Sequence, residues 1–253
     1  MTAALNNFAF RGPSPVSGIH RKIFDTGFPN PLCLGKVRTM GKKRKILVEM
    51  YERLMRAVGP RHWWPAESSF EVIVGAILTQ NTSWTNVEMA IRNLKRMKIL
   101  SPPGIKGIGR DELAQVIRPS GFHRLKASRL KGFVQFFYKE FDGDMRRMMS
   151  QDLASLREQL LKVDGIGPET ADSIILYALE KPIFVVDGYT RRVFCRHNLI
   201  SEKWSYEHVQ RMVMGELERD VGVYNEFHAL LVFLGKHWCR RVPRCGGCPL
   251  EDL

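Results

Sequence analysis

The chain has 253 residues, 44% of them hydrophobic, and a formal net charge of +13 at pH 7. This length and apolar content can bury a sizeable core as one globular unit or two lobes, and no apolar run approaches the roughly 18 residues of a transmembrane helix, so we expect no membrane partner. The positive charge favours a polyanionic partner. Nine of the Lys and Arg residues lie within residues 1–45 against a single acid, so the charge of the remainder supports this interpretation without deciding it.

The first 40 residues differ from the rest of the chain. They contain four prolines and scattered glycines without a sustained hydrophobic period. A second candidate start of the protein occurs at Met40. A disordered basic arm and a mis-called upstream start codon both fit, whereas a transit peptide fits less well because no amphipathic helix emerges. We place no chemistry in residues 1–40 and predict the folded domain at 41–253.

Apolar residues recur at helical spacing through most of the chain beyond residue 45. Convincing alternation with a period of two residues is absent, so we predict an all-α fold. The predicted helices lie at 46–54, 70–78, 86–97, 111–118, 125–138, 152–162, 169–179, 188–198, 206–218 and 224–238.

The most informative stretch is V-D-G-I-G-P-E-T at residues 163–170. A predicted helix leads into the turn Gly165-Ile166-Gly167, and a second helix begins at Pro168, whose fixed φ and missing N–H suit the first helical position. Glycines permit backbone conformations and close approaches that a side chain would forbid. The N–H groups of the turn and the helix N-terminus can therefore meet an anion such as a DNA phosphate.

An acid, Asp187, ends the apolar, strand-like run 183–186. A lone carboxylate there would be costly without a functional reason. A second glycine triplet, Gly107-Ile108-Gly109, follows Pro102 and Pro103. Because proline disrupts a helix, we expect no helix to lead into this triplet and predict a loop.

At these residues the chain resembles the helix-hairpin-helix DNA glycosylases, the superfamily of endonuclease III, whose pattern is a G-[IV]-G hairpin followed by V-D. The resemblance implies that Asp187 is catalytic and that the hairpin residues Gly165, Ile166, Gly167 and Thr170 bind DNA, with a monovalent cation as one means of holding the phosphate. Strand-cutting members have a lysine where this chain has Glu169. Since glutamate forms no Schiff base with a sugar, the resemblance implies a monofunctional N-glycosylase, a hydrolase without lyase activity.

Two other classes of protein stay open. One is an endonuclease III-like glycosylase and AP lyase for oxidised pyrimidines, which the hairpin and the C-terminal cysteines would fit. The other is a non-catalytic helix-hairpin-helix module, since the same hairpin also occurs as a phosphate clamp. Asp187 separates them, because its replacement by Asn abolishes turnover only in an enzyme.

Three cysteines, Cys239, Cys245 and Cys248, lie within ten residues of turn-rich sequence. Thiols at such spacing are typical metal ligands. The stretch 239–253 resembles the iron–sulfur loop of endonuclease III, which implies a [4Fe–4S] cluster whose fourth ligand would stand at position 254. Either the sequence stops one residue early or the cluster has lost a ligand.

Zinc with His237 as a further ligand is the competing interpretation of this loop. A disulfide is a third, less consistent with the reducing compartment expected for a DNA-directed protein. Of the other cysteines, Cys195 is predicted to be a buried apolar residue, and Cys33 lies in the N-terminal arm.

Three tryptophans, Trp63, Trp64 and Trp84, are candidates for a base pocket. Their motifs resemble the bacterial 3-methyladenine glycosylase branch, which implies that they stack the flipped base while Gln80 fills the gap in the duplex. An alkylated purine is cationic, and its attraction to aromatic rings is worth about 0.5–2 kcal/mol. The competing interpretation is that the tandem tryptophans anchor a turn to the core.

The resemblance implies two α-helical lobes with DNA between them, a six-helix lobe at about 66–180 and a second lobe of 41–65 with 181–253. In the implied mechanism, Asp187 stabilises the positive charge that develops on the deoxyribose and orients the attacking water. The expected partners are damaged double-stranded DNA and a downstream AP endonuclease. We expect a monomer in the cytoplasm, associated with the nucleoid, with Lys126 and Lys236 solvated or facing phosphates.

Overall fold

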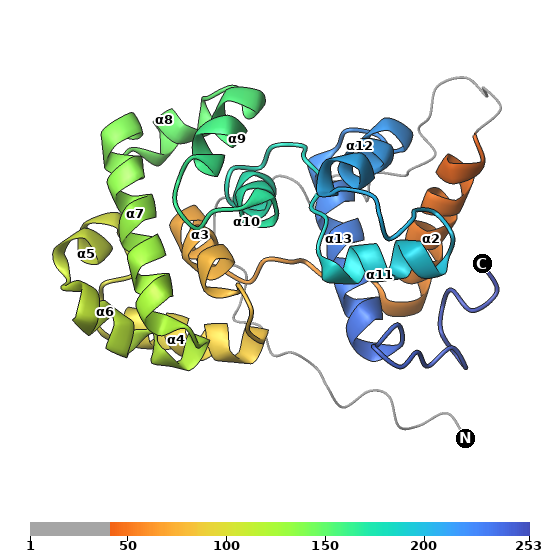
Figure 1. The fold of residues 1–253 in the computed structure, drawn as a ribbon, viewed down its shortest axis with the longest axis horizontal. Helices are drawn as coiled ribbons and strands as arrows, with labels where there is room; N and C mark the ends of the chain where they lie inside the picture. The colour runs from red at the N-terminus through yellow and green to blue at the C-terminus, as the bar shows by residue number, and fades with distance from the viewer. Residues whose placement is uncertain (1–40) are drawn as a thin grey trace. The chain divides into compact units, whose positions relative to one another are not determined.

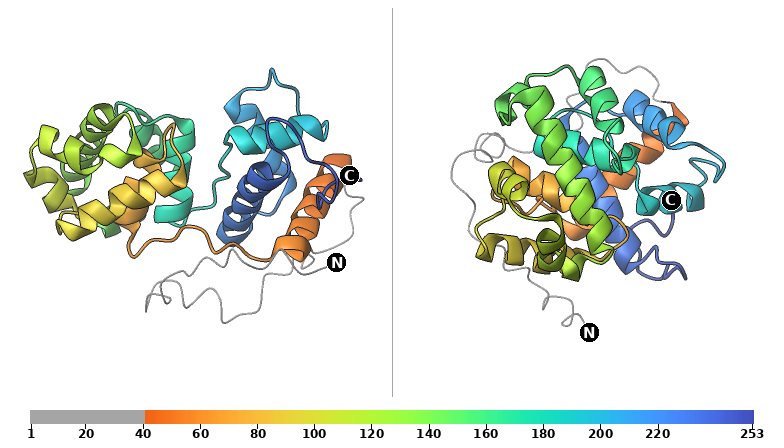
Figure 2. Two further views of the ribbon diagram at one scale, coloured as in Figure 1. Left: turned by 90° about the horizontal axis from the view of Figure 1, so that it is seen from below. Right: turned by 60° about the vertical axis from the view of Figure 1, so that its left-hand side comes forward.

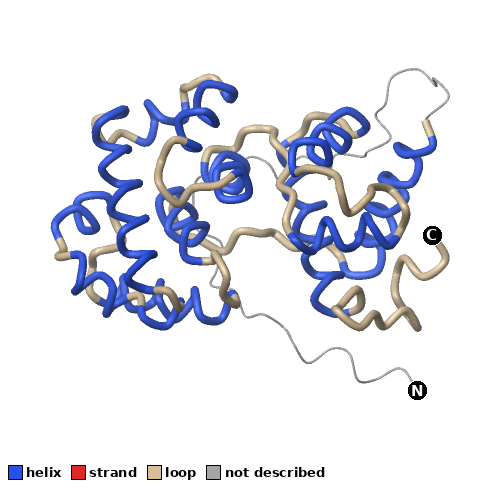
Figure 3. The backbone as a smooth tube through the Cα atoms, viewed as in Figure 1, coloured by secondary structure: helices blue, strands red, loops and turns tan. Residues whose placement is uncertain are grey.

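The computed structural model describes residues 41–253, so the predictions for residues 1–40, Cys33 included, lie outside the described residues. Every regular element within residues 41–253 is helical, and no strand occurs there (Figure 3). The predicted all-α fold is confirmed. The helices are α2 (Lys42–Val58), α3 (Ser69–Leu78), α4 (Trp84–Arg96), α5 (Pro102–Gly107), α6 (Arg110–Val116), η1 (Arg118–Ser120), α7 (His123–Phe141), α8 (Met145–Met149), α9 (Leu153–Leu161), α10 (Pro168–Ser173), η2 (Ile174–Ala178), α11 (Gly188–Arg196), α12 (Tyr206–Glu216) and α13 (Val221–His237).

Several helices start at a residue whose side chain caps the first turn. Ser68, Asp152, Asp187 and Asp220 each accept a hydrogen bond from the backbone N–H three residues along, at the starts of α3, α9, α11 and α13. Such a cap satisfies a donor that has no partner within the helix and typically stabilises by about 1 kcal/mol. The sequence therefore fixes where α11 begins through an acid, Asp187.

The prediction of a loop before Gly107-Ile108-Gly109 is wrong. A short helix, α5, begins at Pro102 and ends at Gly107, and two residues separate it from α6. Pro102 and Pro103 occupy the first turn, where an N–H would have no intrahelical partner in any case. Ser101 caps this turn by accepting from the Gly104 N–H at 3.2 Å. The prolines begin a helix here rather than prevent one.

The helices pack in two groups that are joined by the segments 59–68 and 179–187 (Figures 1 and 2). In one group α2 packs against α12 and α13, and α11 packs against α13. In the other, α7 contacts α3, α5, α6 and α8, and α3 also contacts α4 and η2. Contacts of α13 with η2 connect the groups. The predicted division into lobes at 66–180 and at 41–65 with 181–253 stays a prediction.

One close approach sets the distance between α11 and α13. A Cβ at Gly235 of α13 would collide with the ring of Tyr189 on α11, so glycine lets the two helices meet there. Within residues 41–253, no helix combines the length and hydropathy that crossing a bilayer requires.

Candidate active site

The predicted hairpin lies between α9 and α10. Gly165 has a φ of +76°, a conformation that favours glycine, and a Cβ there would collide with the side chain of Arg129 on α7. Gly167 has an ordinary φ of −87°, and a Cβ there would meet nothing within 4 Å. The backbone N–H groups of both glycines find no acceptor within residues 41–253. The fold itself thus requires glycine at position 165, whereas position 167 borders open space at the start of α10.

Gln80, which follows α3, lies against this hairpin. Its Nε2 donates to the carbonyl oxygen of Gly165 and to Oγ1 of Thr170, each at 2.9 Å. Arg129 donates to Oε1 of Gln80, so the amide is held from both ends. Sequence analysis missed Arg129, because a basic residue on a helix surface carries no signal of the turn that it touches. The structure brings Gln80, Gly165 and Thr170 together.

Asp187 is the N-cap of α11 and is only 9% exposed. Its Oδ1 accepts from the Thr190 N–H at 2.7 Å, and its Oδ2 lies 3.7 Å from Nε2 of His228 on α13. Burial raises the pKa of this carboxyl, but His228 and the Thr190 N–H outweigh burial and bring the pKa below its ordinary value. Asp187 is therefore a carboxylate at neutral pH.

Two further charged groups face Asp187. Glu169 on α10 is exposed overall, but partial desolvation of its carboxyl, followed by the charge of Asp187, raises its pKa, and a positive charge on His228 would act in the opposite direction. Lys236 on α13 is exposed overall, but partial desolvation of its ammonium group lowers its pKa, and the negative charge of Asp187 works in the other direction. Two neighbouring carboxylates disfavour each other's ionisation. The environment therefore separates them, with Asp187 the stronger acid and Glu169 the weaker.

The three predicted pocket tryptophans meet one another. The ring centroids of Trp63 and Trp84 lie 4.6 Å apart, and those of Trp64 and Trp84 lie 5.2 Å apart. Gly75 on α3 makes room for this cluster, since a Cβ there would lie 3.1 Å from the Trp64 indole. All three side chains are half-buried. The tryptophans therefore form an aromatic surface that packs on the core with part of it open to solvent.

Two residues that sequence analysis missed connect this aromatic surface to Asp187. The ring of Tyr177, on η2, lies 5.3 Å from the ring of Trp64. The Tyr177 hydroxyl lies 2.5 Å from Nδ1 of His228, whose Nε2 faces Asp187. No motif marks either residue. The one available signal was a histidine on the apolar face of the predicted helix 224–238, which by itself is typical of a core residue.

The expectation that Lys126 is solvated or faces a phosphate is wrong. Its side chain is 1% exposed, and Nζ donates to the carbonyl oxygens of Leu78 at 2.8 Å and Ser120 at 2.6 Å. Burial, together with the charge of Arg129, lowers the pKa of Lys126 to about 8. Lys126 is a buried residue of α7 whose ammonium group is hydrogen-bonded to the end of α3. Lys236, in contrast, is exposed.

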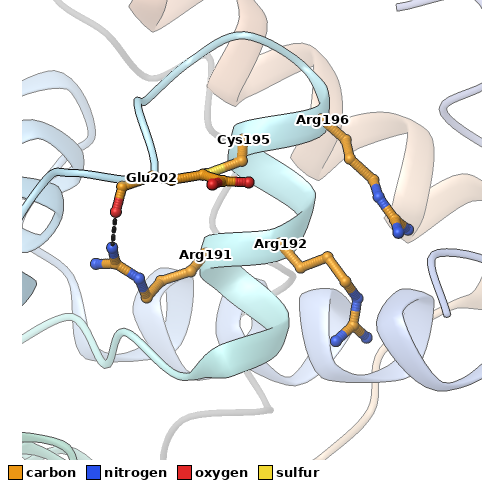
Figure 4. A pocket seen from close by; sticks show the side chains of 5 residues that line it. All are labelled: Arg191, Arg192, Cys195, Arg196 and Glu202. Atoms are coloured by element: carbon orange, nitrogen blue, oxygen red, sulfur yellow. Dashed lines mark hydrogen bonds between the residues drawn. The ribbon is translucent and has the colours of Figure 1, made fainter. Parts of the chain in front are cut away.

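A cavity of about 340 Å³ opens beside α11, and none of the predicted catalytic, pocket or DNA-binding residues lines it (Figure 4). Its lining includes Arg191, which donates to the Glu202 carbonyl oxygen at 3.0 Å (Figure 4). Cys195 also lines it and is half-buried rather than buried. Burial, then the nearby Glu202, raises the pKa of the Cys195 thiol. The raised pKa makes this thiol a poor nucleophile.

The cysteine loop is held by two arginines of α11. Arg192 Nε donates to the Cys239 carbonyl oxygen at 2.6 Å, and Arg196 donates to Cys239 Sγ at 3.2 Å and to the Arg240 carbonyl oxygen at 2.7 Å. Hydrogen bonds from arginine therefore shape the start of the loop. The same contacts tie the loop to the helix that Asp187 caps.

The thiols as arranged do not fit a bound cluster. Cys239 is buried, Cys248 is half-buried and Cys245 is exposed. No set of three or more His, Cys, Asp or Glu side chains in the part of the chain that the structure describes is arranged to hold a metal ion, and a [4Fe–4S] cluster requires four thiolates. His237 lies outside the loop, stacked on the Phe233 ring with centroids 4.0 Å apart. We assign no step of the reaction to a metal.

A hairpin with open backbone donors between α9 and α10 and a buried carboxylate at the start of α11 are features typical of a helix-hairpin-helix protein. The chain belongs to the HhH-GPD superfamily of base excision DNA repair proteins, whose family model matches residues 74–219. Among its relatives, a candidate DNA repair glycosylase of Methanocaldococcus jannaschii is 43% identical over 213 residues, which cover 83% of this chain and 96% of the relative. Endonuclease III of Bacillus subtilis is 26% identical over 185 residues, 73% of this chain and 80% of that protein.

Solved structures share the fold. The 3-methyladenine DNA glycosylase of H. pylori bound to 1,N6-ethenoadenine is similar with a TM-score of 0.65 and 30% identity, covering 77% of this chain and 97% of that one. A trapped endonuclease III–DNA covalent intermediate has a TM-score of 0.71 at 22% identity, covering 83% of this chain and 94% of that one. The predicted fold and the predicted family are confirmed.

Proposed function

We propose that this chain is a monofunctional DNA N-glycosylase of base excision repair that removes alkylated purines, such as 3-methyladenine, from duplex DNA. The observation that carries the proposal is the aromatic surface of Trp63, Trp64 and Trp84, which Tyr177 and His228 connect to the buried carboxylate of Asp187. Electron-rich rings attract a cationic, alkylated base. The similarity to a 3-methyladenine glycosylase supports the same substrate class.

In the proposed reaction the flipped base stacks on the tryptophans while the hairpin holds the DNA backbone. The open space at Gly167 and the unpaired N–H groups of Gly165 and Gly167 suit a phosphate, with or without a bound monovalent cation. Gln80 leaves the hairpin and enters the space that the nucleotide vacates. Gln80 contacts the hairpin proposed to hold the DNA backbone, which places it suitably for that movement.

Asp187 performs the electrostatic part of the chemistry. As the bond between base and sugar breaks, the base leaves with the electron pair and positive charge develops on the deoxyribose. The carboxylate stabilises that charge and orients a water molecule toward C1′. Glu169 supplies no amine, so no covalent intermediate forms and the product is an abasic site in an intact strand, the substrate of an AP endonuclease. We propose that the enzyme acts as a monomer, in the cytoplasm.

The test is release of free base from methylated duplex DNA by the wild type and by Asp187→Asn. We expect methyladenine from the wild type only, at a rate at least 100-fold above the variant because an electrostatic group of this kind typically contributes that much. Strand breaks should appear only after alkali. The matched control is Asp220→Asn, which alters another N-cap aspartate and should leave release unchanged.

Other outcomes assign other functions. Release of uracil or thymine from mismatched DNA, or of oxidised pyrimidines, would replace the alkylpurine proposal. Breaks without alkali would contradict the role given to Glu169, and DNA binding without any base release would indicate a non-catalytic module. The [4Fe–4S] cluster stays a prediction, which iron content and visible absorbance would test.

A further inference from the structure

Tyr177 and His228 form a buried pair directly behind Asp187. Both residues are only 7% exposed, and the Tyr177 hydroxyl lies 2.5 Å from Nδ1 of His228. The other ring nitrogen, Nε2, is buried without a hydrogen-bond partner and lies 3.7 Å from Oδ2 of Asp187. A buried polar atom without a partner is rare in native proteins and calls for an explanation.

The tyrosine determines which nitrogen carries the proton. Burial raises the pKa of Tyr177 well above its ordinary value, so the hydroxyl keeps its proton and donates it to Nδ1. A neutral imidazole that accepts at Nδ1 carries its hydrogen on Nε2. This tautomer directs an N–H donor toward Oδ2 of Asp187, whereas the Thr190 N–H already binds the other carboxylate oxygen, Oδ1.

We propose that His228 is a positioning residue that holds the carboxylate of Asp187 ionised and aimed, and that Tyr177 sets the tautomer that makes this possible. The proposal rests on the function proposed above. The distance of 3.7 Å is long for a hydrogen bond, and catalytic hydrogen bonds are often long before substrate binds. Closing it by about 1 Å as DNA binds would complete the contact and give Nε2 the partner that it lacks.

The groups around Asp187 explain why such a donor is needed. Glu169 faces it from α10 with a like charge, and Lys236 faces it from α13 with an opposite one. Glu226, also on α13, acts on Tyr177 by raising its pKa further. A buried carboxylate with a carboxylate neighbour protonates readily unless donors favour its charged form. The N–H groups of Thr190 and His228 are those donors.

The test compares His228→Leu, His228→Gln and Tyr177→Phe in single-turnover base release as a function of pH. Removing the donor raises the pKa of Asp187, so His228→Leu should move the acidic limb of the rate profile upward by about one pH unit and lower the rate at its plateau about tenfold. His228→Gln keeps a donor near the position of Nε2 and should restore most of the wild-type profile. Tyr177→Phe should give a smaller shift in the same direction.

A merely structural role predicts a different result. The matched control is His208→Gln, an exposed histidine on α12 whose replacement should leave the profile unchanged. The proposal is overturned if the upward shift of the acidic limb in His228→Leu coincides with acid unfolding of that variant. It is also overturned if His228→Leu and His228→Gln both lose rate equally at every pH.

Imidazole ¹⁵N spectra separate this proposal from the proposed function. We expect a hydrogen on Nε2 of His228 in the wild type and a mixture of tautomers in Tyr177→Phe, whether or not any base is released. A wild type without base release but with the expected tautomer would refute the glycosylase and retain the pair. A hydrogen on Nδ1 would refute the pair even in an active enzyme.

Discussion

Asp187 has two roles that a single substitution would confuse. It caps α11 through the 2.7 Å hydrogen bond from the Thr190 N–H, and in the proposed reaction it faces the sugar. Asparagine is also a good N-cap, whereas alanine is not. The two substitutions therefore separate the stability of α11 from the chemistry.

We expect Asp187→Asn and Asp187→Ala to abolish turnover equally, while the alanine variant loses about 1 kcal/mol more than the asparagine variant in its free energy of unfolding at pH 7. Urea unfolding measures the difference. Equal losses in both variants would mean that the charge, and not the cap, stabilises α11.

The same residue contributes to acid sensitivity. Its folded-state pKa lies below the ordinary value, so its stabilisation is complete above an unfolded-state pKa of about 3.9 and is lost as the pH falls through the folded value. Glu169 has the opposite sign, because its raised pKa makes ionisation in the folded state unfavourable as the pH rises.

At the scale of the elements, a buried network joins α9, α10 and α12 to the run that precedes Asp187. Asp172, which is fully buried, accepts from Arg157 at 2.7 and 3.1 Å, from Tyr206 at 2.8 Å and from Gln210 at 2.7 Å. Gln210 also donates to the Phe184 carbonyl oxygen, and the Tyr206 hydroxyl accepts from the Val186 N–H. The network thus fixes the backbone that delivers Asp187.

Replacing Asp172 by Ala should lower the free energy of unfolding by about 3 kcal/mol, because it leaves the Arg157 guanidinium and the Gln210 amide without their acceptor. The estimate is at the low end for a buried pair because 20% of the Arg157 side chain is exposed. Denaturant unfolding checks it, with Asp152→Ala, an exposed N-cap, as the control expected to lose about 1 kcal/mol.

The double variant Arg157→Ala, Asp172→Ala tests the cause. It should be less destabilised than the sum of the two single variants, because no charge is left without its partner. Strictly additive losses would show that the two side chains act independently.

At the scale of the whole molecule, the charge indicates how DNA is bound. Residues 41–253 alone have a formal net charge of +9, because the first 40 residues hold five basic residues and one acid. A basic protein that neutralises phosphates releases counterions on binding. Nonspecific affinity for duplex DNA should then fall as a straight line in a plot of log affinity against log salt concentration.

We expect a salt slope that corresponds to several phosphate contacts, measured by fluorescence anisotropy with an undamaged duplex. The chain without residues 1–40 should bind more weakly, since four net positive charges are removed, and its slope should be shallower. An affinity independent of salt would contradict a phosphate-based interface.

The sequence predicts the parts of this molecule whose signals are local. Helical periodicity gives the fold class, and Gly165, Pro168 and Asp187 give the hairpin and the start of α11, because each acts on backbone within a few residues. It fails at α5, where the position of the prolines in the first turn decides, and at Lys126, one of whose acceptors, the Leu78 carbonyl oxygen, lies 48 residues away. Tyr177 and His228 are 51 residues apart and meet only through packing. No local pattern reveals such a pair.

The arginines that join α11 to the cysteine loop have a consequence for protein engineering. Arg192 and Arg196 donate hydrogen bonds to carbonyl oxygens and one sulfur of the loop, so these contacts depend on the path of the loop backbone. A transplanted loop whose backbone follows a different path would displace the helix that begins at Asp187. Chimeras should therefore exchange α11 and the loop together. A junction placed between them would displace Asp187 and so damage the candidate active site, although the loop contributes no atom to that site.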